Sequence, residues 1–449
     1  MTKLKAKTAL LPDGWANDVT LTLKDGRITA IGDEPAETHV DILLPAPTNL
    51  HSHAFQRAMG GLTERRGAEP TDSFWTWRQL MFRFLDQLTP EDIQAITAQV
   101  QMEMLEAGYA SSVEFHYLHH QPGGHTYDNR AELATRVTAA AAQTGIGLTL
   151  LPVLYAQGGV DGRALGAGQI RFGNDLDGYQ TLWDGAQRAV NDLPADANIG
   201  VAPHSLRAVT PEQIIALQSH GGPIHMHLAE QVAEVQEIET AYGARPVEWA
   251  LANAEIDPRW CLIHCTQMTE AETRNLAATG AVAGLCPLTE SSLGDGIFNG
   301  VTWSDANGVW GIGSDSNILI SLAQELRTLE YSQRLSTLNR AVMATEDHST
   351  GRVLFDGACR GGAQAAGRKS GAIEVGAWAD LMALDGDATD LIGRQGDSVL
   401  DTWIFAGTDT RVSDVWAAGR HMVQGGMHTA HAEITAAYRK TLHRLKDVM

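Results

Sequence analysis

The sequence predicts an α/β fold, a (β/α)8 TIM-like barrel with a small β-sandwich domain that is built from both chain termini. Apolar, strand-like runs alternate with longer amphipathic segments between residues 46 and 355. Eight such runs can be counted, and each is bounded by turn residues, as buried parallel strands are. Short strand-like stretches appear again at both ends of the chain. Eight βα units over about 300 residues fit a closed barrel.

The two ends of the chain predict the second domain. Residues 1–45 are typical of short strands and turns: residues 19–24 alternate apolar and polar side chains with period two, and the Asp25-Gly26 pair supplies a turn. Residues 356–449 return to strand-like runs and finish with a helix near 429–446. We therefore expect residues 1–45 and 356–449 to form one β-sandwich domain with a terminal helix, beside a barrel of residues 46–355.

Each of the eight central runs ends near a recognisable residue. These residues are His51, His116, Tyr155, His204, His227, His264, Pro287 and Asp315. Helices are expected between most of the runs. Thr89, Thr210 and Thr269 each precede an acid or amide by three residues, which is the pattern of a helix capping box. A doubly wound open sheet is the competing architecture, but no Gly-x-Gly-x-x-Gly motif follows the first run.

Composition excludes several classes of protein. The 449 residues carry 33 basic and 54 acidic side chains, a net charge of −21, which argues against a protein that binds phosphate backbones. No signal-peptide core and no run of about 18 apolar residues is present, so we expect a soluble, cytoplasmic protein without a membrane anchor. Four cysteines in a chain of this length are too sparse for a disulfide framework.

Metal-binding side chains recur at the ends of the predicted strands. His51 and His53 share the first, and His204, His227, His264 and Asp315 close the fourth, fifth, sixth and eighth. A single histidine at a strand end is usually a packed residue. With His116 at the second strand, however, five of the eight strands end in histidine, which predicts a metal site at the mouth of the barrel. Neutral imidazoles and a carboxylate suit zinc.

Other polar residues near these positions favour different interpretations. Glu230 lies three residues beyond His227 and could transfer protons beside a metal-bound water, or simply stabilise a helix N-terminus. His225 is expected to fill the barrel interior. The tract 116–125 is expected to be a substrate-facing loop rather than a second metal site. Cys261 and Cys265 lack Cys-x-x-Cys spacing and are expected to be buried rather than to bind zinc.

The whole pattern resembles the amidohydrolase superfamily, which has His-x-His on strand one, histidines on strands five and six, and aspartate on strand eight. The stretch 371–381 is similar to the superfamily's signature after the barrel. The resemblance implies that His51, His53, His227 and Asp315 bind the metal. Residues 200–205 contain no lysine that could bridge two metals, which favours one zinc per subunit. The pattern His227-x-x-Glu230 resembles the deaminase branch.

Within that branch, residues 51–63, 74–81 and 114–124 are similar to the formimidoylglutamate deiminases, or formiminoglutamate iminohydrolases. This implies hydrolysis of N-formimino-L-glutamate to N-formyl-L-glutamate and ammonia in histidine degradation. In such a reaction Asp315 would take the proton of the attacking water. Glu230 would protonate the leaving nitrogen, and His264 would hold and polarise the water.

A substrate with two carboxylates needs cations and strong hydrogen-bond donors. Arg78 and Arg207 are expected to bind the carboxylates of this dicarboxylate substrate. Neutral donors are expected from Gln56, Tyr117 and His204. Arg65 and Arg66 are expected to stay exposed, residues 56–90 are long enough to close over the site, and a homodimer is expected by analogy.

Two rival functions remain open at this stage. A deaminase of a ring such as guanine, cytosine or adenosine would have nearly the same metal site, and the two arginines separate it from the favoured function. A non-enzymatic assembly protein that kept the barrel would usually have lost metal ligands. Activity assays with each substrate and metal analysis distinguish these alternatives.

Overall fold

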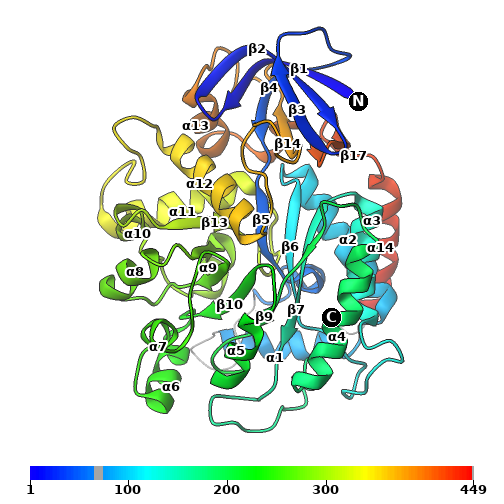
Figure 1. The fold of residues 1–449 in the computed structure, drawn as a ribbon, viewed down its shortest axis with the longest axis vertical. Coiled ribbons are helices and arrows are strands. Elements are labelled where there is room, and N and C mark those ends of the chain that lie inside the picture. Colours follow the sequence, from blue (N-terminus) through cyan, green and yellow to red (C-terminus); the bar gives the residue numbers. More distant parts are fainter. Residues whose placement is uncertain (65–73, 447–449) are drawn as a thin grey trace.

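The central unit is a ring of parallel strands. The computed structural model describes residues 1–64 and 74–446, and Figure 1 shows these strands running through the middle of the molecule. The barrel strands are β5 (Thr48–Ser52), β6 (Ser111–His116), β7 (Gly147–Leu154), β8 (Asn198–Ile199) with β9 (Ala202–Pro203), β10 (Ile224–Leu228), β11 (Trp260–His264), β12 (Val282–Leu285) and β13 (Val309–Ile312).

Hydrogen bonds close these strands into a barrel. Neighbours pair in parallel from β5 to β8 and from β10 to β13. Two parallel bridges, Val201 with Ile224 and Ser52 with Asp315, join the two sheets at both seams. Nearly all residues of these strands are buried, as expected of a parallel sheet that is covered on both faces. The predicted (β/α)8 barrel is therefore confirmed.

Two predicted strand ends are displaced by a few residues. β12 ends at Leu285, because Pro287 is the first residue of helix α9 and cannot donate a ladder hydrogen bond. β13 ends at Ile312, and Asp315 follows with a left-handed φ of 46°. The fourth strand is split into β8 and β9, with His204 just after the second piece.

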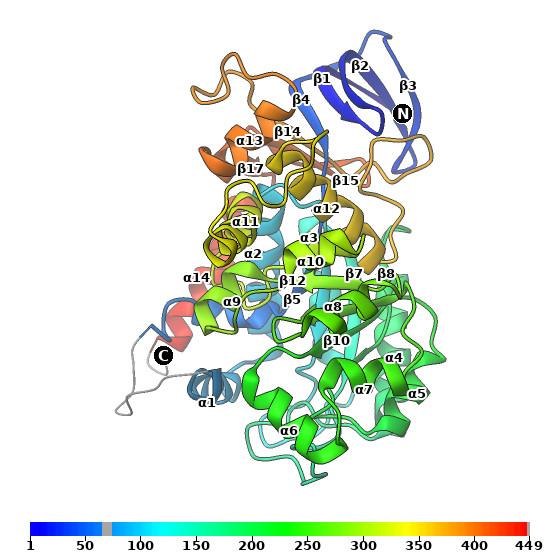
Figure 2. The same ribbon diagram turned by 90° about the vertical axis from the view of Figure 1, so that its left-hand side faces the viewer.

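Figure 2 shows the helices, most of which surround the barrel, from a second direction. They are η1 (Ala54–Met59), α1 (Phe74–Leu85), α2 (Pro90–Glu106), α3 (Glu132–Thr144), α4 (Leu176–Asn191), α5 (Pro211–Gln218), α6 (Val232–Tyr242), α7 (Pro246–Asn253), α8 (Glu270–Ala277), α9 (Pro287–Leu293), α10 (Gly300–Asp305), α11 (Leu322–Thr337), α12 (Thr350–Ala365), α13 (Asp397–Phe405), η2 (Asp409–Arg411) and α14 (His431–Leu445). The capping boxes predicted at Thr89, Thr210 and Thr269 are present and begin α2, α5 and α8.

Strands from the N-terminal and C-terminal segments form one sheet at the end of the molecule drawn uppermost in Figure 1. Its strands are β1 (Thr2–Leu11), β2 (Gly14–Lys24), β3 (Arg27–Gly32), β4 (Thr38–Pro45), β14 (Leu381–Leu384), β15 (Val412–Ala417), β16 (Arg420–Gln424) and β17 (Met427–His428). The N-terminal and C-terminal strands join where β4 pairs antiparallel with β14. This pairing explains why both ends of the sequence contain short strand-like runs.

Helix α12 packs directly on the barrel. A Cβ atom on Gly361 would lie 1.8 Å from the Trp310 carbonyl oxygen, and one on Gly362 would lie 2.7 Å from the Thr48 carbonyl oxygen. Only glycine allows such close approach of a helix to the strands. The predicted domain boundary at residue 355 falls inside this helix. We therefore propose that the barrel unit extends to Ala365.

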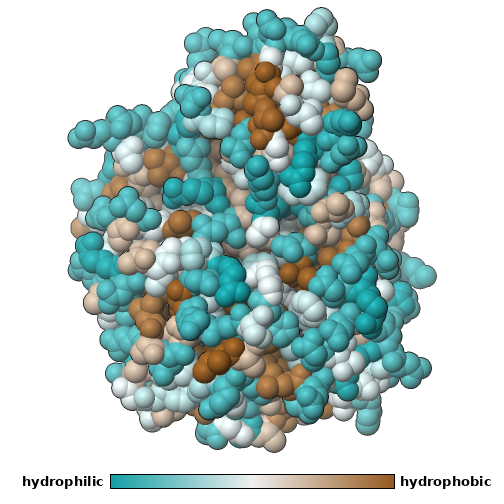
Figure 3. All heavy atoms as spheres, in the orientation of Figure 1, coloured by the Kyte–Doolittle hydropathy of each residue, from teal (hydrophilic) through white to brown (hydrophobic). Residues whose placement is uncertain are grey.

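The surface is largely polar. Figure 3 shows hydrophilic residues over most of one face, with hydrophobic residues in small separate groups. None of the helices in residues 1–64 and 74–446 combines the length and the apolar character that a membrane span needs.

Candidate active site

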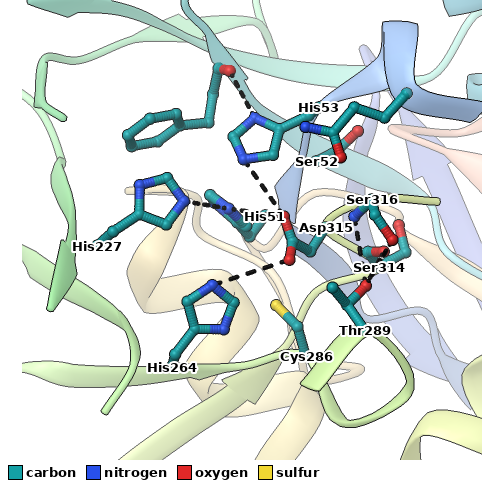
Figure 4. Close-up of polar contacts among 12 residues, drawn as sticks. His51, Ser52, His53, His227, His264, Cys286, Thr289, Ser314, Asp315 and Ser316 are labelled. Carbon is teal, nitrogen blue, oxygen red and sulfur yellow. Dashed lines mark hydrogen bonds and ion pairs between the residues drawn. The ribbon is translucent and has the colours of Figure 1, made fainter. Parts of the chain in front are cut away.

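Four side chains meet at the carboxyl ends of the barrel strands. His51 lies on β5, His53 follows that strand, His227 lies on β10, and Asp315 follows β13. One nitrogen or oxygen from each lies within 4.8 Å of the others (Figure 4). The Asp315 Oδ1 atom is 3.4 Å from His51 Nε2 and 3.3 Å from His53 Nε2. Residues far apart in sequence thus present ligand atoms to one point.

The hydrogen bonds of the rings orient their free nitrogens toward that point. His53 Nδ1 lies 3.1 Å from the Phe115 carbonyl oxygen, and His227 Nδ1 lies 3.2 Å from the His204 carbonyl oxygen. A ring that donates through Nδ1 to a carbonyl presents the lone pair of Nε2, which is the arrangement around histidine metal ligands.

Burial and charge fit a cation at this position. Burial lowers the pKa of His51 to about 3 and also lowers the pKa values of His53 and His227, so these rings are neutral near pH 7. The His51 and His227 Nε2 atoms are only 3.2 Å apart. Within the described residues, His51 Nδ1 is buried and has no hydrogen-bond partner. Three neutral imidazoles and one carboxylate are the donor set of a zinc site.

A second group of charged side chains lies beside the first. His264 ends β11, and its Nε2 atom is 3.8 Å from both Glu230 Oε1 and Asp315 Oδ2. Burial alone would lower the pKa of His264, but Glu230, Glu290 and Asp315 raise it to about 10. Burial raises the pKa of Glu230. The two oxygens of Asp315 therefore face different partners, Oδ1 the two histidines of β5 and Oδ2 His264.

The predicted substrate-binding residues surround a pocket next to these groups. The space between the lining atoms, including the part that is open to solvent, has a volume of about 550 Å³. The five predicted residues that line it are Gln56, Arg78, Tyr117, His204 and Arg207. Arg78 comes from α1, while Arg207 is buried and lies with its Nη2 atom 3.9 Å from Glu230 Oε2. Arg65 and Arg66 lie outside the described residues.

Three other histidines contact the backbone. His225 is buried, with Nε2 2.8 Å from the Ala365 carbonyl oxygen. In the tract 116–125, Tyr117 lines the pocket. His119 and His120 instead contact the backbone carbonyl oxygens of Val153 and Gly173, at 2.9 and 2.7 Å. Within this tract, Tyr117 thus faces the pocket, whereas backbone contacts hold the rings of His119 and His120.

Sequence reasoning missed several residues of the site. Glu290, in the first turn of α9, accepts hydrogen bonds from His264 Nδ1 at 3.2 Å and from the Cys286 backbone N–H at 2.8 Å. His264, Cys286 and Glu290 also form a group with metal-ligand spacing, but these bonds make Glu290 an orienting partner of His264. Asp295 is buried nearby, and burial raises its pKa to about 9. A carboxylate just after a strand end was the signal for Glu290.

Comparison with known proteins identifies the family. Residues 42–422 match the model of the amidohydrolase family. The chain belongs to the amidohydrolase family. Residues 1–37 match the N-terminal domain of formimidoylglutamate deiminase HutF. The predicted resemblance is confirmed.

Individual amidohydrolases show how far the similarity extends. A formimidoylglutamate deiminase of Pseudomonas aeruginosa is 45% identical over 100% of both chains. A 5-methylthioadenosine/S-adenosylhomocysteine deaminase of Natronomonas pharaonis is 28% identical, over 91% of this chain and 87% of that protein.

Solved structures agree with the fold. An amidohydrolase from Brucella melitensis is 45% identical and superposes with a TM-score of 0.95, covering 99% of this chain and 100% of that one. A zinc-bound adenosine deaminase from Xanthomonas campestris, 21% identical, has a TM-score of 0.82 and covers 99% and 98% of the two chains. This second likeness shows the fold alone.

Proposed function

We propose that this amidohydrolase is a formimidoylglutamate deiminase, which hydrolyses N-formimino-L-glutamate to N-formyl-L-glutamate and ammonia in histidine degradation. The observation that carries the proposal is one pocket that joins a four-residue ligand cluster to two arginines. A hydrolytic centre and two cations are what a dicarboxylate amidine requires. The 45% identity to the Pseudomonas enzyme over both whole chains supports the same activity.

The cofactor in this proposal is one zinc ion per chain. His51, His53, His227 and Asp315 would hold it, since their ligand atoms converge and their Nε2 lone pairs face inward. A bound zinc ion supplies the Lewis acidity that makes water a nucleophile near neutral pH. The donor set of three neutral imidazoles and one carboxylate supports this choice of metal.

Two side chains then transfer protons, and a third holds the attacking water. Asp315 Oδ2 faces away from the β5 histidines and accepts the proton of the attacking water. His264 Nε2 donates a hydrogen bond to the attacking oxygen, because Glu290 fixes its other nitrogen. Glu230, whose pKa is raised by burial, delivers a proton to the imino nitrogen. Asp315 then passes the proton of the water to the same nitrogen, and Glu230 accepts the proton of the newly formed hydroxyl group. The C–N bond to that nitrogen breaks, ammonia leaves, and the hydroxyl oxygen becomes the carbonyl oxygen of the formyl product.

The other pocket residues bind and orient the substrate. Arg78 and Arg207 each hold one carboxylate, with Gln56, Tyr117 and His204 as neutral donors. Arg207 lies close to Glu230, so binding of a carboxylate there also places the formimino group beside the proton donor. Orientation of this kind contributes a large part of an enzyme's rate enhancement.

Ammonia release provides the test. The purified, zinc-loaded protein is offered N-formimino-L-glutamate and, separately, guanine, cytosine and adenosine. We expect ammonia from formiminoglutamate alone. Activity on a ring substrate with none on formiminoglutamate would refute the proposal and favour a ring deaminase. Less than stoichiometric metal after dialysis would revive the non-enzymatic alternative. The homodimer and the cytoplasmic location stay predictions, which sedimentation and cell fractionation test.

A further inference from the structure

The pocket contains a tyrosine that the proposed mechanism does not use. Tyr155 follows the end of β7, is 3% exposed and lines the pocket beside Arg78 and His204. Its ring centroid lies 4.6 Å from that of His204. The hydroxyl therefore sits among the groups that are proposed to bind the substrate.

Two neighbouring side chains donate hydrogen bonds to the hydroxyl oxygen of Tyr155. Arg78 Nη2 lies 2.7 Å from the hydroxyl oxygen, and a guanidinium can only donate. Gln169 Nε2 lies 2.9 Å away on another side. The amide of Gln169 is fixed in this orientation, because its Oε1 accepts the Gly166 backbone N–H at 2.9 Å. Both neighbours therefore donate to the Tyr155 oxygen.

A hydroxyl that accepts two hydrogen bonds keeps its own proton to donate. No acceptor for the Tyr155 proton occurs within the part of the chain that the structure describes. The other pocket tyrosine differs in this respect. Tyr117 accepts from Gln56 Nε2 at 2.9 Å, and its own proton faces the weak acceptor Met81 Sδ at 3.5 Å, a contact that it would leave in order to donate to the substrate.

We propose that the Tyr155 hydroxyl donates a hydrogen bond to the substrate carboxylate that Arg78 binds, and so helps to select a dicarboxylate. The inference rests on the proposed function, because it takes N-formimino-L-glutamate as the ligand. Arg78 and Tyr155 touch each other, so one carboxylate can accept from both. An O–H···O⁻ bond is short and about twice as strong as a neutral one. Gln169 is a positioning residue that holds the hydroxyl oxygen.

Binding measurements test this role without turnover. Calorimetry on the zinc-loaded protein measures the Kd of the product, N-formyl-L-glutamate, for wild type, Tyr155→Phe and Tyr242→Phe. We expect Tyr155→Phe to raise the Kd about tenfold, the usual cost of a charge-assisted hydrogen bond. Tyr242→Phe, which removes a hydroxyl from the end of α6, should match wild type. An unchanged Kd for Tyr155→Phe overturns the inference.

The same substitution in a protein that lacks Arg78 shows whether Tyr155 itself donates a hydrogen bond to the ligand or acts only by positioning Arg78. In an Arg78→Met protein, Tyr155→Phe should raise the Kd by a further threefold or more, on the scale of a weak hydrogen bond at about 0.6 kcal/mol. No further rise would mean that Tyr155 only positions Arg78, and would overturn the proposed donation.

Two truncated ligands identify the group that Tyr155 contacts. N-formyl-L-norvaline lacks the side-chain carboxylate, and 4-formamidobutanoate lacks the α-carboxylate. For one of them, Tyr155→Phe and wild type should bind equally. A loss of the same size on both overturns the inference. If wild type binds N-formyl-L-glutamate but releases no ammonia from formiminoglutamate, the proposed function fails while this test of Tyr155 still decides.

Discussion

Two ends of the barrel bury charged groups in opposite ways. At the base, where the barrel meets the terminal sheet, Arg368 contacts Asp196 at 2.9 Å and Asp380 at 2.6 Å. Arg420 adds a bond of 2.7 Å to Asp196. At the mouth, three neutral imidazoles and Asp315 face one point instead. At the base, the buried arginines and aspartates are paired with one another, whereas the side chains at the mouth are arranged to bind a cation.

This difference teaches which charges serve the fold and which serve the chemistry. A buried ion pair with all partners present holds two units together but does little else. Nearby carboxylates keep the pKa of Arg368 raised although burial alone would lower it. The three imidazoles of His51, His53 and His227 have lowered pKa values because they are buried without a separate carboxylate for each ring. A metal ion supplies what they lack.

The largest effect is expected at the mouth. His227→Ala removes one ligand, and we expect kcat to fall at least about 10⁴-fold, or about 5.4 kcal/mol, because nucleophile activation by the metal is lost. Steady-state kinetics and metal analysis of the dialysed protein measure this. His220→Ala, a change near the surface, is the control. Full metal content together with wild-type kcat in His227→Ala would contradict the division between mouth and base.

The next effect is on stability and belongs to the base. Arg368→Met leaves Asp196 and Asp380 buried without their main partner, so we expect the free energy of unfolding to fall by about 3–5 kcal/mol. Urea unfolding of the zinc-loaded protein measures it. Arg259→Met breaks an exposed pair with Asp257 and should cost less than about 1 kcal/mol. Equal decreases in the free energy of unfolding of the two variants would mean that the buried ion pairs at the base stabilise the fold no more than an exposed ion pair does.

Much of this contrast could be predicted from the sequence. His51, His53, His227 and Asp315 stand at or just after strand ends, and parallel strands that close into a barrel bring their ends together. Their convergence follows from strand order alone, although metal binding by them stays a prediction. The capping boxes were predictable for a similar reason, since each depends on residues three apart.

Other parts depend on contacts that no local pattern contains. Arg368 and Asp196 are 172 positions apart in the sequence. They meet only because α12 ends at the base of the barrel, just before Arg368. Tyr155 was placed at a strand end, but its role depends on Gln169 in a loop and Arg78 on α1. Side-chain direction in loops is set by tertiary packing, so periodicity cannot reveal it.

A smaller effect on kcat is expected from the partner of His264. Glu290→Gln keeps the shape of the side chain and removes its charge, so His264 loses a carboxylate that orients and charges it. We expect kcat to fall about tenfold with KM little changed, because losses of this size are usual when a residue that orients a metal-site side chain is replaced. Glu270→Gln on the exposed start of α8 is the control. A rise in KM at constant kcat would contradict the orienting role.

The smallest effect concerns how the free energy of unfolding falls in acid. It tests whether the burial of a histidine, without any ion pair, makes the protein less stable at low pH. Burial lowers the pKa of His116 to about 3, against an ordinary value of 6.5, and its Nε2 atom has no partner among the described residues. Since the unfolded chain takes up the proton first, stability is retained above pH 6.5 and lost as the pH falls toward 3.

Between pH 7 and pH 5.5 this single group should cost about 1 kcal/mol, at 1.36 kcal/mol per pKa unit. His116→Leu should remove that part of the decline, which urea unfolding at the two pH values measures with both proteins saturated with zinc. Saturation matters because zinc affinity itself falls in acid as the ligands take up protons. An identical pH dependence in the two proteins would show that burial without a charged partner does not govern the histidines around this barrel.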